Sequence, residues 1–180
     1  MDKPLWQPNP TTAKESHMAH FITYINQQHQ CAIENYFQLH HWSITYPEKF
    51  WPAVWTFTEI KTRHKWTKVL SNPDNMLKTK WFSSARLNFA ENLLRHRNDK
   101  VALIFCNEQG LQRTLTYAQL YIQVIQLAAA MRAMGIKPHD RVAGFLPNMP
   151  ETIIAMLATT SLGAIWSSCS PDFGISGVLD

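Results

Sequence analysis

Between residues 11 and 30, apolar positions recur with the period of an α-helix. The apolar positions of this predicted helix are Met18, Phe21, Ile22 and Ile25. Either Thr11 or Thr12 can cap its N-terminus, because a threonine oxygen accepts a hydrogen bond from a free backbone amide. One face of the helix is therefore expected to be buried.

Residues 33–60 predict two further helices, separated between Ser43 and Pro47. The aromatic stripe of the second helix contains Phe50, Trp51, Val54 and Trp55. No cluster of Arg or Lys accompanies it, so it predicts packing of one segment on another rather than a platform for nucleobases. Pro52 must begin this helix or kink it, since proline lacks the amide that an interior helical residue donates. From Lys61 to Arg86 the periodicity is lost, which predicts irregular surface structure or a linker.

A different pattern begins at Asn88, which can cap a short helix through Leu94. Two apolar runs follow, at residues 101–105 and 111–115, with a Glu-Gln-Gly turn signal at 108–110. Short runs of this kind on either side of a glycine-containing turn predict a β-hairpin.

The next helix is predicted from its two ends. Thr116 and Gln119 have the spacing of a capping box, in which each side chain satisfies a backbone amide of the first turn. Gly135 can end the helix, because glycine adopts the left-handed conformation without steric cost. The stripe between them contains Leu120, Val124, Leu127, Met131 and Met134.

Residues 141–168 predict a strand, a helix and a second strand. The strands are residues 141–146 and 164–168, and the helix ends at Gly163. Asn148 can cap this helix and Pro150 can occupy its first turn. A strand, helix and strand of these lengths form a βαβ unit with two parallel strands. We therefore expect an α/β fold, with a helical N-terminal segment packed on the start of an open, mostly parallel sheet.

Composition narrows the class of protein. The 180 residues are 46% hydrophobic, which excludes a disordered tail. Seventeen Lys and Arg against 13 Asp and Glu give a formal charge of +4 without a basic stripe, so no nucleic-acid partner is expected. Six of the seven tryptophans lie in the first half, which predicts two regions with different roles.

The cellular compartment is predicted from cysteines and hydropathy. Cys31, Cys106 and Cys169 are too far apart for a disulfide framework or a zinc knuckle, which fits a reducing cytosol. No run approaches the roughly 20 apolar residues that span a bilayer, and the N-terminus lacks the apolar core of a signal peptide. We expect a cytoplasmic protein without membrane insertion.

Two loops are the candidate sites for chemistry, because ligands of open parallel sheets bind beyond the carboxyl ends of the strands. They are residues 147–150 and 168–174. With Ser167 before it, the second loop forms the sequence SSCSPDFG (167–174), whose small polar groups can face a phosphate or an adenine. The alternative is a capped turn with Asp172 as the N-cap of a helix. Cys169 is favoured as a small residue at a strand end over a nucleophile, since no base is evident in the sequence.

No metal ligand or catalytic residue is assigned from the sequence. The pairs His17 with His20 and His40 with His41 lack a third ligand at a recognisable spacing, so helix-surface positions are favoured. No glycine-rich phosphate loop is present. Residues 175–179 predict the start of a helix, so we expect the chain to be truncated at Asp180.

Four segments carry a family resemblance. They are PLWQP (4–8), WFSSARLNFAENLL (81–94), LTYAQL (115–120) and DRVAGFLPNMPETIIAMLATTSLGAIWSSCSPDFG (140–174). They resemble the N-terminal part of acetoacetyl-CoA synthetases, the acetoacetate–CoA ligases of the adenylate-forming enzyme superfamily. The resemblance implies a reaction in which acetoacetate attacks Mg-ATP to give acetoacetyl-AMP and diphosphate, and CoA then displaces AMP. ATP, Mg²⁺ and CoA are the implied cofactors.

The resemblance also implies an organisation and a binding site. Residues 1–95 would be the helical, Trp-rich N-terminal segment, and residues 96–180 the beginning of the AMP-binding α/β domain. Ser170, Pro171 and Asp172 would lie beside the CoA adenine. The phosphate loop, metal ligand and lysine of the family lie beyond Asp180, so the chain would be inactive alone.

Two alternatives remain open. The chain could be a non-catalytic adapter that binds a partner through its aromatic helices. It could also be the front half of a split acyl-CoA synthetase, such as an acetyl-CoA synthetase relative, with the missing C-terminal part on another chain.

Overall fold

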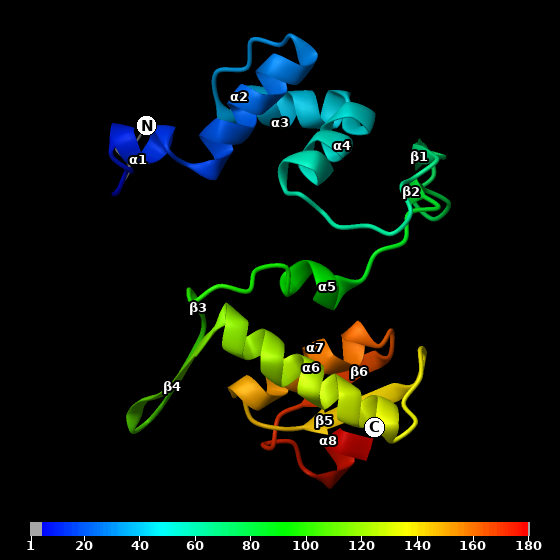
Figure 1. Cartoon of the computed structure of the whole chain (residues 1–180). Helices are drawn as coiled ribbons and strands as arrows, with labels where there is room; N and C mark the ends of the chain where they lie inside the picture. The colour runs from blue at the N-terminus through cyan, green and yellow to red at the C-terminus, as the bar shows by residue number, and fades with distance from the viewer. Residues whose placement is uncertain (1–4, 180) are drawn as a thin grey trace. The chain divides into compact units, whose positions relative to one another are not determined.

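A computed structural model describes residues 5–179 of the chain (Figure 1). Pro4, with which the PLWQP motif begins, lies outside the described residues. The chain forms two compact units. The first comprises Met1–Ile60 with His64–Ala85, and the second comprises Lys61–Arg63 with Arg86–Asp180. We call them the helical unit and the sheet unit.

The helical unit contains helices and one small sheet. The helices are α1 (Pro10–Lys14), α2 (His17–His29), α3 (Tyr36–Thr45) and α4 (Pro47–Phe57), and the strands are β1 (Lys68–Ser71) and β2 (Lys80–Ser83). The predicted caps Thr11 and Thr12 are wrong. Asn9 caps α1 and Ser16 caps α2, because the chain breaks at Glu15 and so forms two helices where one was predicted.

A buried aromatic and aliphatic core holds the helices of this unit together. It contains Phe21, Ile25, Ile33, Leu39, Trp42 and Ala53. The ring of Phe21 meets Phe50 edge-on at 5.9 Å and Phe57 at 5.0 Å between ring centroids. The aromatic stripe therefore joins α4 to α2, as predicted. Pro52 neither begins α4 nor ends it, and the helix starts at Pro47.

The region from Lys61 to Arg86 is more regular than predicted. Strands β1 and β2 pair antiparallel, with Leu70 opposite Trp81. The pairing is supported by rings that come from distant positions. Trp51 contacts Trp81 with ring centroids 6.0 Å apart, and Phe82 contacts both Trp55 and Trp66, at 4.7 and 5.0 Å. Local periodicity could not reveal a hairpin whose stability comes from α4.

The sheet unit follows the predicted order of elements. They are α5 (Phe89–Leu93), β3 (Val101–Asn107), β4 (Gly110–Thr116), α6 (Tyr117–Ala133), β5 (Arg141–Phe145), α7 (Pro150–Ser161), β6 (Ile165–Cys169) and α8 (Ile175–Leu179). Strands β3 and β4 form the predicted hairpin. The capping box of Thr116 and Gln119 opens α6, and Gly135 follows its end with a φ of +95°. Asn88 caps α5 by accepting from the Glu91 amide at 3.0 Å.

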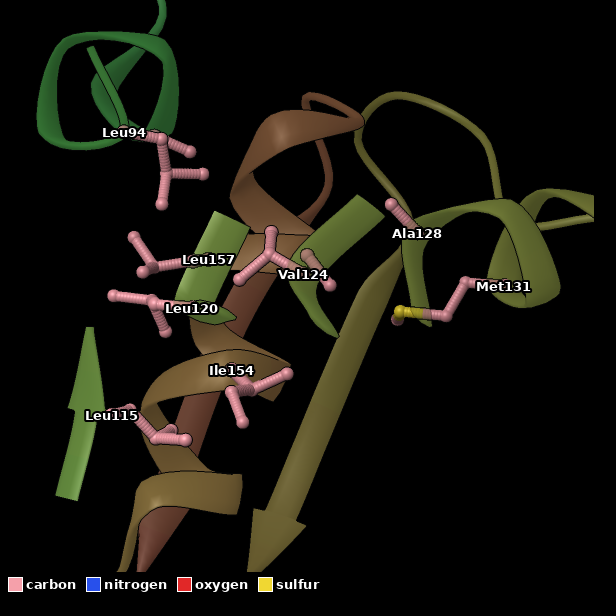
Figure 2. Packing of buried hydrophobic residues seen from close by; sticks show 10 residues of the cluster. Leu94, Leu115, Leu120, Val124, Ala128, Met131, Ile154 and Leu157 are labelled. Atoms are coloured by element: carbon pink, nitrogen blue, oxygen red, sulfur yellow. The ribbon is translucent and has the colours of Figure 1, made fainter. Parts of the chain in front are cut away.

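The core of the sheet unit lies between α5, α6, α7 and the hairpin. Figure 2 shows Leu94, which directly follows α5, together with Leu115 of β4, Leu120 and Val124 of α6, and Ile154 and Leu157 of α7. Val124 is 1% exposed and Leu157 is 2% exposed, so their side chains contribute nearly the full free energy of apolar burial, about 1.5–3 kcal/mol each. An ion pair also connects the hairpin to α7. Arg113 Nη2 on β4 lies 2.6 Å from Glu151 Oε1 in the first turn of α7.

The parallel sheet of the βαβ unit confirms the predicted α/β class. β5 and β6 pair in parallel, from Arg141 opposite Ile165 to Phe145 opposite Cys169. One face packs on helix α7, and on the other face Phe145 and Ile165 remain 54% and 51% exposed. No helix within residues 5–179 has the length and hydropathy to cross a membrane.

Candidate functional site

The two loops predicted to carry chemistry lie at the same edge of the β5–β6 sheet. Phe145 and Cys169 are paired in register and are the last residues of their strands. The Leu146 amide also donates to the Cys169 carbonyl at 3.4 Å, so the pairing extends into the first loop. Both loops therefore begin beside each other, at the carboxyl edge where parallel sheets bind their ligands.

The loop after β6 is held by its own side chains. The Ser170 hydroxyl donates to the Asp172 carboxylate at 2.8 Å, and the Asp172 amide donates back to Ser170 Oγ at 3.3 Å. The Phe173 amide donates to the Ser170 carbonyl at 3.1 Å. These bonds close a tight turn over the three candidate residues. The alternative role of Asp172 as a helix N-cap is wrong, because α8 begins at Ile175 and Gly174 precedes it.

This turn presents hydrogen-bond acceptors to a ligand. Ser170 is half-buried, while Pro171 and Asp172 are exposed. Because the hydroxyl hydrogen of Ser170 is directed to Asp172, the free lone pairs of the carboxylate are the strongest acceptors here. A carboxylate accepts from an amino group and repels a phosphate. The geometry suits an N–H group such as the amine of an adenine.

The loop after β5 is built around the start of α7. Pro150 occupies the first helical position, as predicted, and its side chain is buried. The predicted cap Asn148 is wrong, since Met149 precedes the helix and no side chain caps it. Instead the Thr152 hydroxyl donates to the Pro147 carbonyl at 2.7 Å and fixes the turn from within the helix.

The remaining sequence candidates are not brought together. His17 and His20 lie on α2, and His40 and His41 lie on α3. Within residues 5–179, no three His, Cys, Asp or Glu side chains are grouped closely enough to hold a metal ion. Cys169 is half-buried at the end of β6 and is a free cysteine.

Sequence reasoning missed a cavity with a basic wall in the sheet unit. Its wall includes Lys61, Arg63, Arg86 and Arg97. The signal that could have indicated it is the basic run KTRHK at residues 61–65, which lies in the segment predicted as irregular.

Comparison with known families identifies the sheet unit. The family model described as AMP-binding enzyme matches residues 89–178, half of the chain. The chain belongs to the AMP-binding enzyme family. A second model, described as the acetyl-coenzyme A synthetase N-terminus, matches residues 36–93. The two matched ranges overlap at residues 89–93.

Two of the relatives that match this chain are named acetoacetyl-coenzyme A or acetoacetyl-CoA synthetase. The acetoacetyl-coenzyme A synthetase of Rhizobium meliloti (strain 1021) is 46% identical over 99% of this chain, and that of Xenopus tropicalis is 42% identical over 99%. The structure of the acetoacetyl-CoA synthetase from Streptomyces lividans covers 99% of the chain with a TM-score of 0.90 at 37% identity. The chain spans 27% of each of the two relatives and 28% of the Streptomyces chain.

Proposed function

We propose that this chain is the N-terminal portion of an acetoacetate–CoA ligase. The complete enzyme would convert ATP, acetoacetate and CoA to acetoacetyl-CoA, AMP and diphosphate through acetoacetyl-AMP. The observation that carries the proposal is the 46% identity to a protein named acetoacetyl-coenzyme A synthetase, which extends over 99% of the chain.

The proposal assigns a role to each part of the chain. Residues 1–95 form the N-terminal segment of the ligase, and residues 96–180 begin its AMP-binding domain. The order of the two matching family models, 36–93 and then 89–178, supports this division.

Ser170, Pro171 and Asp172 form the CoA side of the proposed site. Their position at the carboxyl edge of the parallel sheet supports this role. The exposed Asp172 carboxylate can accept from the adenine amine of CoA, while Ser170 holds the carboxylate in place. When bound, CoA supplies the thiol that accepts the acyl group.

Alone, the chain is proposed to be inactive. Acyl-phosphate chemistry needs positive groups aimed at the charge that develops on the phosphate. The sequence contains no Ser/Thr/Gly-rich loop ending in Lys that would supply them. The remaining residues of the ligase would be contributed by the same polypeptide or by a second one.

A chimeric enzyme tests the proposed function. The matching first part of the Rhizobium meliloti relative is replaced by this chain, and acetoacetate-dependent diphosphate release is measured with CoA and ATP present. We expect a folded chimera to release diphosphate and form acetoacetyl-CoA, and the isolated 180-residue chain to do neither. A folded chimera without activity, beside an active parent, contradicts the proposal.

The CoA role is tested in the same chimera. Asp172→Asn removes the charge but keeps an acceptor, and Asp172→Ala removes both. We expect the alanine variant to raise KM for CoA about tenfold with KM for ATP unchanged, and the asparagine variant to lie between. Asp140→Ala, which changes a carboxylate at the opposite end of β5, is the control. Equal effects on both KM values contradict a role specific to CoA.

A further inference from the structure

A cavity of about 470 Å³ lies in the sheet unit, away from the proposed CoA loop. Its wall includes Gly163, which comes just before β6, whereas Ser170 comes just after β6. The two places therefore lie at opposite ends of the same strand. A volume of this size is within the range of roughly 300–1,000 Å³ that small-molecule sites occupy.

Hydrogen bonds hold one side of the cavity in place. The Arg63 amide donates to the Arg86 carbonyl at 2.9 Å, and the Thr62 hydroxyl donates to the same carbonyl at 2.8 Å. The Asn92 side chain accepts from the Lys61 amide at 2.8 Å and donates to the Lys61 carbonyl at 3.1 Å. Residues 61–63 are thereby fixed beside Arg86, although they are distant from it in sequence.

Part of the cavity lining is apolar and aromatic. Tyr121, Val124 and Ile125 of α6 contribute to it, with Leu94 and Leu162. The Arg97 guanidinium lies over the Tyr121 ring, 3.9 Å from its centroid. This cation–π contact places one of the basic side chains of the lining against one of its aromatic rings.

The side chains that line the cavity carry a net positive charge. Lys61, Arg63, Arg86 and Arg97 line the wall, and Glu91 is the one acidic side chain on it among the described residues. None of these basic side chains forms an ion pair within residues 5–179. Arg side chains bind phosphate through paired N–H donors, and the charge assistance makes such bonds about twice as strong as neutral ones.

We propose that this cavity binds an organic phosphate, whose phosphate groups contact Arg63 and Arg86 and whose flat, apolar body contacts the α6 side. The basic side chains of the lining fit the phosphate, and its apolar side chains explain why the body of the ligand should also contribute to the affinity. The site is separate from the Ser170–Asp172 loop and does not depend on the proposed ligase activity.

Amide chemical shifts of the ¹⁵N-labelled 180-residue chain, titrated with ADP as the probe, test the proposal. We expect the shifts of residues 61–63, 86–97 and 121–125 to move, whether or not residues 168–174 also respond to the adenine amine of ADP. Arg63→Gln and Arg86→Gln should each weaken ADP binding about tenfold, since each removes a charge-assisted pair of hydrogen bonds. Arg132→Gln, an equal change of charge elsewhere on α6, should weaken it less than twofold.

Two further probes separate the phosphate from the body. Diphosphate should bind at the same amides more weakly than ADP, and adenosine should cause no shifts there. Circular dichroism checks that each variant is folded. If Arg63→Gln does not fold, Arg63→Lys replaces it and should retain part of the affinity for ADP. The proposal is overturned if ADP moves no amide at the cavity at millimolar concentration, if Arg63→Gln and Arg86→Gln bind as the parent does, or if adenosine binds as well as ADP.

Discussion

Gly144 of β5 lies close to the ring of Trp166. A Cβ added there would lie 2.5 Å from Cη2 and 2.8 Å from Cζ2 of Trp166. The ring would have to move within a packed interface, which costs about 1–3 kcal/mol. We expect Gly144→Ala to lower the free energy of unfolding by that amount, measured by urea denaturation.

Gly174 provides the matched control for this substitution. A Cβ there meets no heavy atom within 4 Å, so Gly174→Ala should change the free energy of unfolding by less than about 0.5 kcal/mol. Equal effects of the two alanines would show that Trp166 does not need the space at Gly144.

Asn88 links two elements with one side chain. Its carbonyl oxygen accepts from the Glu91 amide at 3.0 Å, and its amide nitrogen donates to the Thr160 carbonyl at 2.8 Å. Asn88→Ala should lower the free energy of unfolding by about 2 kcal/mol, because it removes a helix cap and a partly buried hydrogen bond together. Asn88→Asp keeps the cap and loses the donor, so about half of that loss is expected. If the aspartate variant is as stable as the parent, the bond to Thr160 contributes nothing.

At the scale of elements, helix α4 contains an interior proline, Pro52. Pro52 lies inside the helix and leaves the carbonyl of Glu48 without its helical donor, but Glu48 is exposed and its carbonyl can bond water. Pro52→Ala should raise the free energy of unfolding by about 2 kcal/mol, the helical gain of alanine less the entropy that proline removes from the unfolded chain. Pro47→Ala, at the first helical position, should not stabilise the chain. Thermal unfolding of both variants measures the difference, and equal shifts would contradict this explanation.

Elements that depend on local signals were predicted from the sequence. The capping box of Thr116 and Gln119 and the glycine after α6 act within a few residues, so α6 and its ends could be found from the sequence alone. The β1–β2 hairpin could not, because its support comes from Trp51 and Trp55, which are distant in sequence. Caps also failed where the chain makes a turn that hydropathy does not mark, as at Glu15 and Met149.

The two candidate sites also differ in how far they could be predicted from the sequence. The loops after β5 and β6 follow their strands directly, so the βαβ pattern was enough to place them at one edge. The basic cavity depends on hydrogen bonds that tie residues 61–63 to the Arg86 carbonyl and to the Asn92 side chain. Its basic residues are scattered along the sequence and are brought together only by folding.

At the scale of the whole molecule, one face of the β5–β6 sheet is left partly uncovered. Parallel strands are normally covered on both faces, whereas Phe145 and Ile165 are about half exposed on the same face here. We expect the 180-residue chain to self-associate through this face, and Phe145→Lys combined with Ile165→Lys to shift it toward the monomer in sedimentation velocity.

A second double variant controls for the added charge. Phe37→Lys with Ile44→Lys changes two exposed apolar residues of α3, which are 81% and 63% exposed, and should leave self-association unchanged. A monomeric parent chain, or an equal effect of the two double variants, contradicts a role for the sheet face.

Trp166 has an optical consequence. The other six tryptophans of the sequence lie at or before Trp81. Trp166 is therefore the one tryptophan of the sheet unit, which comprises Lys61–Arg63 and Arg86–Asp180. Its ring lies against Gly144, across the pairing of β5 with β6. The difference between the emission spectra of the parent and Trp166→Phe therefore isolates a single chromophore, whose wavelength reports whether the two parallel strands are paired.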